Sequence, residues 1–286
     1  MKFRTEIPIP TYPWKIDYTH QLMCMGSCFA EHIGDFFKKN RFHTLVNPFG
    51  TLFNPMSIAN GIELALHPEN FSDNLVTLHN REWISFAHHG KFSHANKTLF
   101  FEQINQQLNE THTFLTKTDF LFLTFGTAYV YRHVERNFIV ANCHKMPAST
   151  FEKYRLTIDD IVEKYRWIIH TLQSINPMLK IIFTVSPVRH LADGFHENQL
   201  SKSILHLAIE KILEKTSHTF YFPAYEILND DLRDYRFYGE DLCHPNDVAI
   251  SYMKEMIIQS FFSKETELER KKVEKERKRA ERRPIR

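Results

Sequence analysis

The chain has 286 residues, of which 43% are hydrophobic and 24% are charged, as in an ordinary globular protein large enough to bury a core. No run of about 18 apolar residues indicates a membrane span, and the first residues lack the apolar core of a signal peptide. The four cysteines, at positions 24, 28, 143 and 243, form no C-x-x-C pair, which argues against a disulfide scaffold. We therefore expect a cytoplasmic protein with reduced thiols.

The net charge of +2 is divided unevenly along the chain. Residues 264–286 hold 11 Lys and Arg against 6 Glu, whereas residues 1–263 hold 25 basic against 28 acidic residues. An acidic body does not favour a nucleic-acid partner. The last segment is helix-forming, but its few apolar residues do not sustain a coiled coil. We predict one domain over residues 1–263 and a charged, solvated helical tail over residues 264–286, with electrostatic contact to RNA or anionic lipid as the alternative role of the tail.

Apolar periodicity predicts helices and strands that alternate along the chain. The predicted strands cover residues 21–25, 43–50, 119–128, 180–187 and 219–228, and the predicted helices cover residues 28–42, 54–66, 97–115, 157–176, 198–216 and 245–262. Residues 129–144 alternate like a hairpin that turns near 135–137. This order predicts an α/β domain with a mostly parallel sheet, whose ligands bind at the carboxyl ends of the strands. The segments Gly26-Ser27, Gly126-Thr127 and 186–190 lie at those ends.

Two short motifs carry candidate catalytic residues. Ser27 joins a strand to a helix in MCMGSCFAEHIG, where free amides and the helix dipole can stabilise an oxyanion. A serine nucleophile needs a base, and in YGEDLCHP a carboxylate, Asp241, precedes His244 by three residues and can orient its ring. The structural alternative makes Ser27 an N-cap and the second motif a capping turn with a surface histidine.

Longer segments make the chain resemble the GSCFA family. They are MGSCFA (25–30), NPFGTLFNP (47–55), TFGTAYVY (124–131), ANCHK (141–145), VSPVRH (185–190), YFPAYEI (221–227) and DYRFYGEDLCHP (234–245). The resemblance covers about residues 5–260, and the family is similar to the SGNH, or GDSL-like, hydrolases. It implies a flavodoxin-like three-layer α/β/α sandwich with a mostly parallel sheet. It also implies a Ser-His-Asp triad, with Ser27 as nucleophile, His244 as general base and then acid, and Asp241 as the orienting carboxylate.

The resemblance implies an oxyanion hole as well. Two of its donors would be the backbone amides of Ser27 and Gly50. Where the related hydrolases have Gly-x-Asn, this chain has Gly126-Thr127-Ala128, so the usual side-chain donor is missing. Losing one such donor costs about 3 kcal/mol of transition-state stabilisation. Asn47, Asn54 and Asn142 are candidate substitutes, and we favour Asn142.

Three further residues are candidates for substrate binding. Arg189 and His190 end a predicted strand, and Thr127 follows another. Arg189 can hold a carboxylate or phosphate, or it can form a structural ion pair with Asp231 or Asp234.

Three of the cysteines lie inside the matching motifs. Cys28, Cys143 and Cys243 stand beside Ser27, His144 and His244. They can be metal or redox ligands, or small packing residues, but their spacing matches no zinc pattern. We expect no metal and no cofactor.

We therefore expect a serine hydrolase that removes an acyl group from a carbohydrate or other small polar ester through an acyl-enzyme. An acyltransferase with the same triad is a close alternative, and a non-hydrolytic binding protein on the same fold is another. A metal-dependent enzyme that uses the cysteines is a third. The sequence predicts neither the acyl group nor the oligomeric state.

Overall fold

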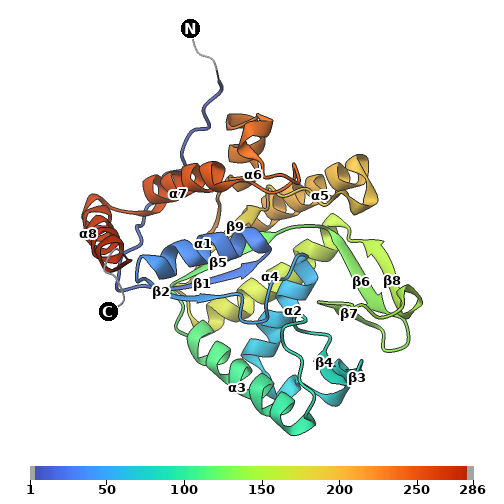
Figure 1. Ribbon diagram of the computed structural model, residues 1–286. Helices are drawn as coiled ribbons and strands as arrows, with labels where there is room; N and C mark the ends of the chain where they lie inside the picture. Colours follow the sequence, from blue (N-terminus) through green and yellow to red (C-terminus); the bar gives the residue numbers. More distant parts are fainter. Residues whose placement is uncertain (1–3, 282–286) are drawn as a thin grey trace.

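A five-stranded parallel sheet lies at the centre of the computed structural model, which describes residues 4–281 (Figure 1). The ends of the predicted domain and tail, residues 1–3 and 282–286, lie outside the described residues. The strands are β1 (Gln21–Gly26), β2 (His43–Val46), β5 (Phe120–Phe125), β9 (Lys180–Val185) and β10 (Thr219–Tyr221), in the order β2-β1-β5-β9-β10. Counting only these five strands, this is the flavodoxin-like order 2-1-3-4-5.

Helices cover both faces of the sheet, so the predicted three-layer α/β/α architecture is confirmed. Because side chains of a strand point alternately to its two faces, Leu22 and Cys24 of β1 enter one core while Met23 and Met25 enter the other. The first core is closed by α1 (Cys28–Lys39) and α7 (Asp247–Phe261), and the second by α2 (Pro55–Leu66), α3 (Lys97–Leu115), α4 (Ile158–Ile175) and α5 (Phe195–Leu213).

Local capping fixes where several of these helices begin. Asn54 caps α2 by accepting a hydrogen bond from the Ser57 amide at 2.8 Å, with Pro55 at the first helical position. Thr157 and Asp160 form a reciprocal capping box at the start of α4. Both starts agree with the sequence pattern, since such residues satisfy amides that the helix leaves free.

Two small antiparallel sheets are inserted between the helices. One pairs β3 (Val76–His79) with β4 (Glu82–Ser85), and the other joins β7 (Phe138–Val140), β6 (Tyr129–His133) and β8 (Phe151–Arg155). The predicted hairpin over residues 129–144 is therefore confirmed as β6 and β7. Short 3₁₀ helices cover Pro68–Asn70, Asp73–Leu75, Ala148–Thr150, Leu191–Asp193 and Tyr235–Phe237.

The strand predicted over residues 219–228 is wrong in its second half. Only β10 is extended, and the chain turns at Pro223 into α6 (Ala224–Glu226) and a π-helical turn, Ile227–Asp231. The apolar residues that suggested a strand, Ile227 and Leu228, pack instead into the core beside α7. Short apolar runs do not by themselves distinguish strand from buried helix.

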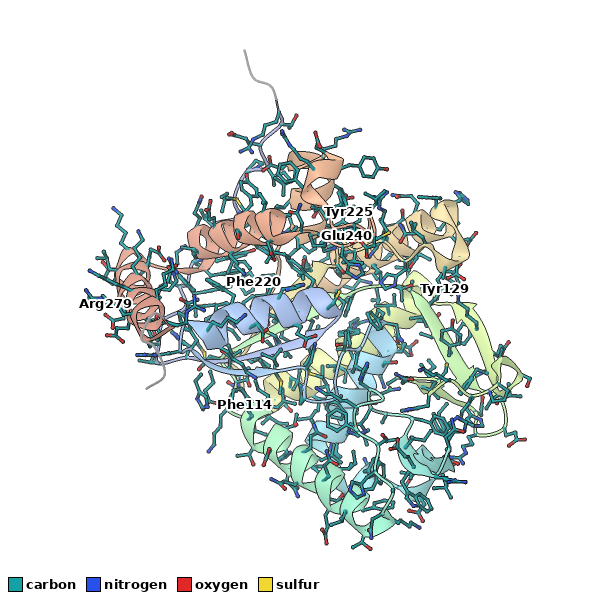
Figure 2. All side chains as sticks on the ribbon, in the orientation of Figure 1. Phe114, Tyr129, Phe220, Tyr225, Glu240 and Arg279 are labelled. Atoms are coloured by element: carbon teal, nitrogen blue, oxygen red, sulfur yellow. The ribbon has the colours of Figure 1, made fainter. Side chains whose placement is uncertain are left out.

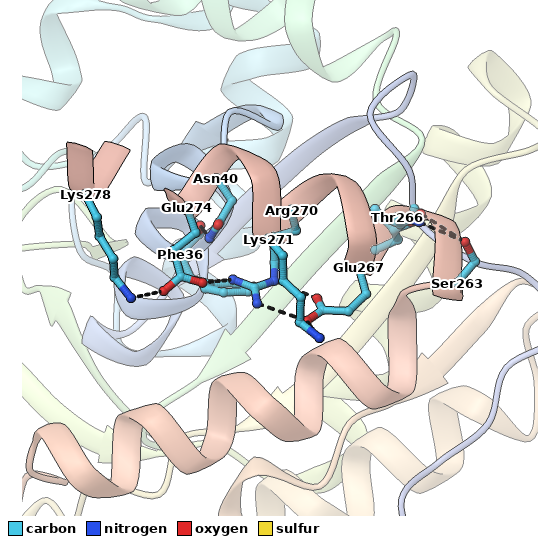
Figure 3. Close-up of polar contacts among 10 residues, drawn as sticks. Phe36, Asn40, Ser263, Thr266, Glu267, Arg270, Lys271, Glu274 and Lys278 are labelled. Atoms are coloured by element: carbon cyan, nitrogen blue, oxygen red, sulfur yellow. Dashed lines mark hydrogen bonds and ion pairs between the residues drawn. The ribbon is translucent and has the colours of Figure 1, made fainter. Parts of the chain in front are cut away.

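The C-terminal helix α8 (Lys264–Glu281) is packed along one face, contrary to the predicted solvated tail. Thr266, Arg270 and Val273 are only 5%, 9% and 7% exposed, whereas Leu268 is 61% exposed. Figure 3 shows Arg270 held between Glu267 and Glu274, near Phe36 of α1. Because an arginine can bury its aliphatic stem while its charge is paired, a helix with few apolar residues can still pack.

Candidate active site

Ser27 and Gly126 follow the neighbouring strands β1 and β5, at the point of the sheet where the strand order reverses. Sheets of this type bind ligands at that point. A Cβ atom on residue 126 would lie 3.4 Å from Ser27 Cβ and 3.1 Å from His190 Nε2. Gly126 is therefore packed closely against both Ser27 and His190, where a larger residue would crowd the imidazole.

Ser27 is the N-cap of α1 and is only 1% exposed. Its Oγ accepts a hydrogen bond from the Phe29 amide at 3.4 Å. Gly26 has a φ of 137°, and a Cβ there would lie 2.2 Å from the Thr124 carbonyl oxygen, so the turn before Ser27 requires glycine. Among the described residues, Ser27 Oγ makes no hydrogen bond with His244. The capping role is thus present, and a nucleophilic role requires Oγ to turn towards the imidazole.

The predicted contact between Asp241 and His244 is present. Asp241 Oδ2 lies 2.5 Å from His244 Nδ1, and Oδ1 accepts hydrogen bonds from the backbone amides of His244 at 2.9 Å and Cys243 at 3.0 Å. These bonds, with the His244 amide first, hold the pKa of Asp241 well below its usual range. A charged carboxylate at Nδ1 stabilises the tautomer whose Nε2 is free to accept a proton.

Arg189 fixes the loop that carries this pair. Its Nη2 donates to the Leu242 carbonyl at 3.1 Å, and its guanidinium lies 5.2 Å from the centre of the Tyr238 ring. Within residues 4–281 it forms neither of the predicted ion pairs, because Asp231 pairs with Arg4 and accepts a hydrogen bond from Tyr252, and Asp234 lies next to Arg236. Arg189 therefore holds the loop from Tyr238 to His244, which contains Glu240 (Figure 2).

The loop lies at the carboxyl end of β9, where Arg189 bonds it. Burial first, and then nearby charges that include His244, lower the pKa values of His32 on α1 and of His190 after β9. Because Arg189 follows β9 and bonds the loop, Asp241 and His244 lie at the carboxyl ends of the parallel strands, as Ser27 does.

The predicted backbone donors of the oxyanion hole are already occupied. The Gly50 amide donates to the Asn47 carbonyl at 2.8 Å, and the Ser27 amide donates to the Thr124 carbonyl at 3.2 Å. Asn47 and Gly50 have φ angles of 41° and 79°, and this tight turn directs the Gly50 amide inward. In this conformation the Gly50 amide is bonded within the turn, and its role as an oxyanion donor stays a prediction. The next amide, that of Thr51, has no acceptor among the described residues.

The three candidate asparagines have different surroundings. Asn54 is committed to its cap, and its Nδ2 donates to Ser57 Oγ at 3.0 Å. Asn47 Oδ1 accepts from the Gly26 amide at 2.9 Å, while its Nδ2 is buried without a partner among the described residues. Asn142 Oδ1 accepts from the His144 amide at 2.7 Å, and the side chain faces a cavity. Only Asn47 and Asn142 thus retain an uncommitted amide nitrogen.

A cavity of about 340 Å³ opens beside this region. It brings together the predicted residues Thr127, Asn142 and His190, although neither Ser27 nor His244 lines it. Aromatic rings form much of its wall, including Tyr129, which Figure 2 labels on β6. Lys153 pairs with Asp193 at the cavity and lies 4.9 Å from the centre of the Tyr129 ring. The lining residues are Phe53, Asn54, Thr127, Tyr129, Tyr131, Val140, Ala141, Asn142, Cys143, Lys153, His190, Ala192 and Asp193.

Lys202 is a residue of this region that the sequence reasoning missed. It is 1% exposed, and its Nζ donates to the carbonyl oxygens of Gly126 at 2.6 Å and Ser186 at 2.7 Å. Burial lowers its pKa to about 7. A signal was available, because Lys202 lies on the apolar stripe of α5 with Leu205 and Ile209, where a lysine is unusual.

The cysteines of the matching motifs do not come together as a metal site. All four are free thiols, and burial raises the pKa values of Cys28 and Cys143, the latter to about 11. Across residues 4–281, no three His, Cys, Asp or Glu side chains are placed to hold one metal ion. Raised thiol pKa values indicate packing rather than nucleophilic cysteines.

A comparison with models of protein families identifies the family of the chain. The model of the GSCFA family matches residues 21–257, and the chain belongs to this family. The match contains Ser27, Gly126, Asp241 and His244. No curated protein sequence matches the chain.

Solved structures similar to this chain include two esterases. One is a carbohydrate esterase family 3 protein from Talaromyces cellulolyticus, with 7% identity and a TM-score of 0.38 over 83% of this chain and 94% of the other. The other is the acetyl xylan esterase Est2A from the rumen bacterium Butyrivibrio proteoclasticus, with 9% identity and a TM-score of 0.43 over 89% of this chain and 64% of the other. Within residues 4–281, no helix has the length and apolar character needed to cross a bilayer.

Proposed function

We propose that the protein is a serine hydrolase that cleaves an ester. The observation that carries this proposal is the carboxylate–imidazole pair of Asp241 and His244. Arg189 bonds the loop of this pair to the carboxyl end of β9, and Ser27 follows the carboxyl end of the parallel strand β1. Such a pair supplies an oriented base to a serine at a strand-to-helix junction.

In this mechanism, Ser27 Oγ attacks the ester carbonyl carbon and passes its proton to His244 Nε2. The tetrahedral intermediate collapses to an acyl-enzyme, and His244 returns the proton to the departing alcohol. A water molecule, deprotonated by His244, then releases the acid and restores Ser27. Asp241 keeps Nδ1 protonated and stabilises the imidazolium that forms in each half-reaction.

The cavity beside the site favours a small polar alcohol such as a carbohydrate as the substrate component. Flat tyrosine rings and polar side chains are both present in its wall, and pockets of this mixed character orient small ligands through a few polar contacts. Thr127, Asn142 and His190 would then contact substrate. Transfer of the acyl group to a second alcohol in place of water would use the same residues.

Hydrolysis of p-nitrophenyl acetate and butyrate by the wild type and by Ser27→Ala tests the proposal. We expect turnover in the wild type and its loss in the variant, together with loss of labelling by a fluorophosphonate probe. If Ser27→Ala hydrolyses the esters at the wild-type rate, Ser27 is not the nucleophile.

A second candidate function is ligand binding without hydrolysis. It is favoured by the occupied amides of Ser27 and Gly50, because a hydrolase needs free donors for the oxyanion. A wild-type protein that neither labels nor hydrolyses any tested ester would support this candidate.

A further inference from the structure

One buried polar atom beside the nucleophile lacks a partner. His190 Nε2 is sealed from solvent and forms no hydrogen bond within residues 4–281. It lies close to Ser27, because a Cβ atom on residue 126 would lie 3.1 Å from His190 Nε2 and 3.4 Å from Ser27 Cβ. Buried polar groups are nearly always satisfied, so an unpaired ring nitrogen at this position indicates that its partner arrives with a ligand.

The His190 ring is held in place by its surroundings. The backbone amide of His190 donates to Asn198 Oδ1 at 2.9 Å, and Asn198 is itself only 4% exposed. The Phe53 ring packs edge-on against the imidazole, with centres 5.5 Å apart and planes at 76°. A donor fixed in advance need not reorganise as charge develops on the substrate, which is what an oxyanion site requires.

Electrostatics keep this ring neutral. Burial lowers the pKa of His190 to about 4, and the nearby charges of Lys202 and His244 act in the same direction, against a weaker opposite effect of Asp193. A neutral imidazole has one N–H to donate and little tendency to take up a second proton. It is therefore suited to donate a hydrogen bond, while His244, with its carboxylate partner, is suited to act as the base.

We infer that His190 donates its Nε2–H to the oxyanion that forms when Ser27 attacks the ester, in place of the missing asparagine. The inference rests on the proposed function. During attack, the carbonyl π electrons become a lone pair on oxygen, which accepts the hydrogen bond, and His190 keeps its proton throughout. Asn47 Nδ2 and Asn142 Nδ2 are the competing donors. The Asn47 side chain is anchored to the Gly26 amide on the β2 side of β1, and Asn142 lines a cavity that Ser27 does not line.

The test compares wild type, His190→Ala, His190→Gln, Asn47→Asp and Ser27→Ala as full chains. The readouts are the rate of fluorophosphonate labelling and kcat and KM for p-nitrophenyl acetate. Removing one such donor lowers kcat by about 10²- to 10³-fold in other enzymes, so we expect a loss of this size in His190→Ala with little change in KM. His190→Gln, which restores an N–H donor, should recover at least part of it, and Asn47→Asp should lose less than His190→Ala.

Several outcomes would overturn the inference. Wild-type labelling that is lost in Ser27→Ala but unchanged in His190→Ala would reject His190 and leave the proposed function intact. A larger loss in Asn47→Asp would assign the donor to Asn47, and a folded His190→Gln as inactive as His190→Ala would show that His190 does more than donate. A wild type that does not label would reject the proposed function and the inference with it.

A second measurement observes the His190 ring of the wild-type protein directly. In wild type labelled with ¹⁵N-histidine, the phosphonate adduct should bring the His190 Nε2–H proton into a strong hydrogen bond and move its resonance downfield. The assignment follows from His190→Gln. A His190 ring spectrum that is identical before and after labelling would also overturn the inference.

Discussion

Lys202 Nζ donates to the Gly126 carbonyl at 2.6 Å, so a buried ammonium group fixes the backbone next to Ser27. Its second bond, to Ser186, joins the carboxyl end of β5 to that of β9. A fully buried cation with two carbonyl partners costs desolvation energy. The protonation of Lys202 should therefore affect the stability of the protein, and this effect can be measured.

The first prediction concerns alkaline pH. Burial lowers the Lys202 pKa to about 7 from 10.5, so between these values the unfolded chain binds one proton more than the native protein. The free energy of unfolding then rises with pH, by at most about 1.4 kcal/mol per pH unit. Urea denaturation at pH 7 and 9 should show this gain in wild type and its absence in Lys202→Met. Equal pH dependence in both proteins would contradict the prediction.

A second prediction concerns acid. Burial lowers the pKa values of His88, His190 and His206 to about 4, so the unfolded chain takes up more protons between pH 6.5 and 4. Stability contributed by the neutral rings is present above this window and is lost as the pH falls through it. Denaturation midpoints across this range should fall less steeply in His206→Gln than in wild type. Parallel curves would show that His206 titrates alike in both states.

The third prediction separates catalysis from folding at Asp241. Asp241→Asn keeps an oxygen for the amides of Cys243 and His244 but removes the charge that holds His244 Nδ1. Loss of the corresponding charge in a serine-protease triad costs about 10⁴-fold in kcat, and we expect a loss of similar order with an unchanged circular dichroism melting curve. Asp247→Asn, at the first turn of α7, is the matched control and should stay active. Normal turnover in Asp241→Asn would exclude it from the triad.

A fourth prediction concerns the close packing around Gly126. In Gly126→Ala the new Cβ would meet the Phe53 carbonyl oxygen at 3.0 Å and His190 Nε2 at 3.1 Å. The methyl group would push the imidazole away from its position near Ser27, so we expect ester turnover to fall more than tenfold. Gly90→Ala is the control, since its nearest neighbour lies at 3.9 Å. Equal turnover in both variants would show that the position of the His190 ring beside Gly126 does not affect catalysis.

The fifth prediction contrasts two apolar residues of α8. Val273 is 7% exposed and Leu268 is 61% exposed. Val273→Asp buries a charge and should lower the free energy of unfolding by about 2–3 kcal/mol, whereas Leu268→Asp should change it by less than about 0.5 kcal/mol. Chemical denaturation measures both. Equal effects would show that α8 does not pack on the body in solution.

The alternation of strands and helices was predictable because it depends on local periodicity and capping. Asn54 and Thr157 are typical N-cap residues and predict where α2 and α4 begin. The buried strands are visible as apolar runs. The end of the predicted strand at Pro223 and the packed face of α8 were not predictable, since each depends on what lies opposite in space. For the same reason the role of Lys202 was not predictable, because its two carbonyl partners follow the distant strands β5 and β9.

Part of the candidate site was likewise predictable from local sequence, and part was not. The Asp241–His244 pair is local and was predicted from its spacing. Whether the Gly50 amide is free depends on the φ angles of a turn, and whether His190 Nε2 faces Ser27 depends on Gly126, which is distant in sequence. Backbone donors and through-space neighbours require the three-dimensional structure.

The contact between Ile16 and the C-terminal helices has a consequence for biosynthesis. The Ile16 amide donates to the Phe261 carbonyl at 2.7 Å, and the Ile16 carbonyl accepts from the Thr266 hydroxyl at 3.2 Å. The core on the α1 side of the sheet also contains residues of α7, so it is completed only after α7 has left the ribosome. Until then the nascent chain exposes aromatic surface, and such intermediates are prone to aggregate. A chain that stops before α7 should therefore aggregate more readily than the chain that contains it.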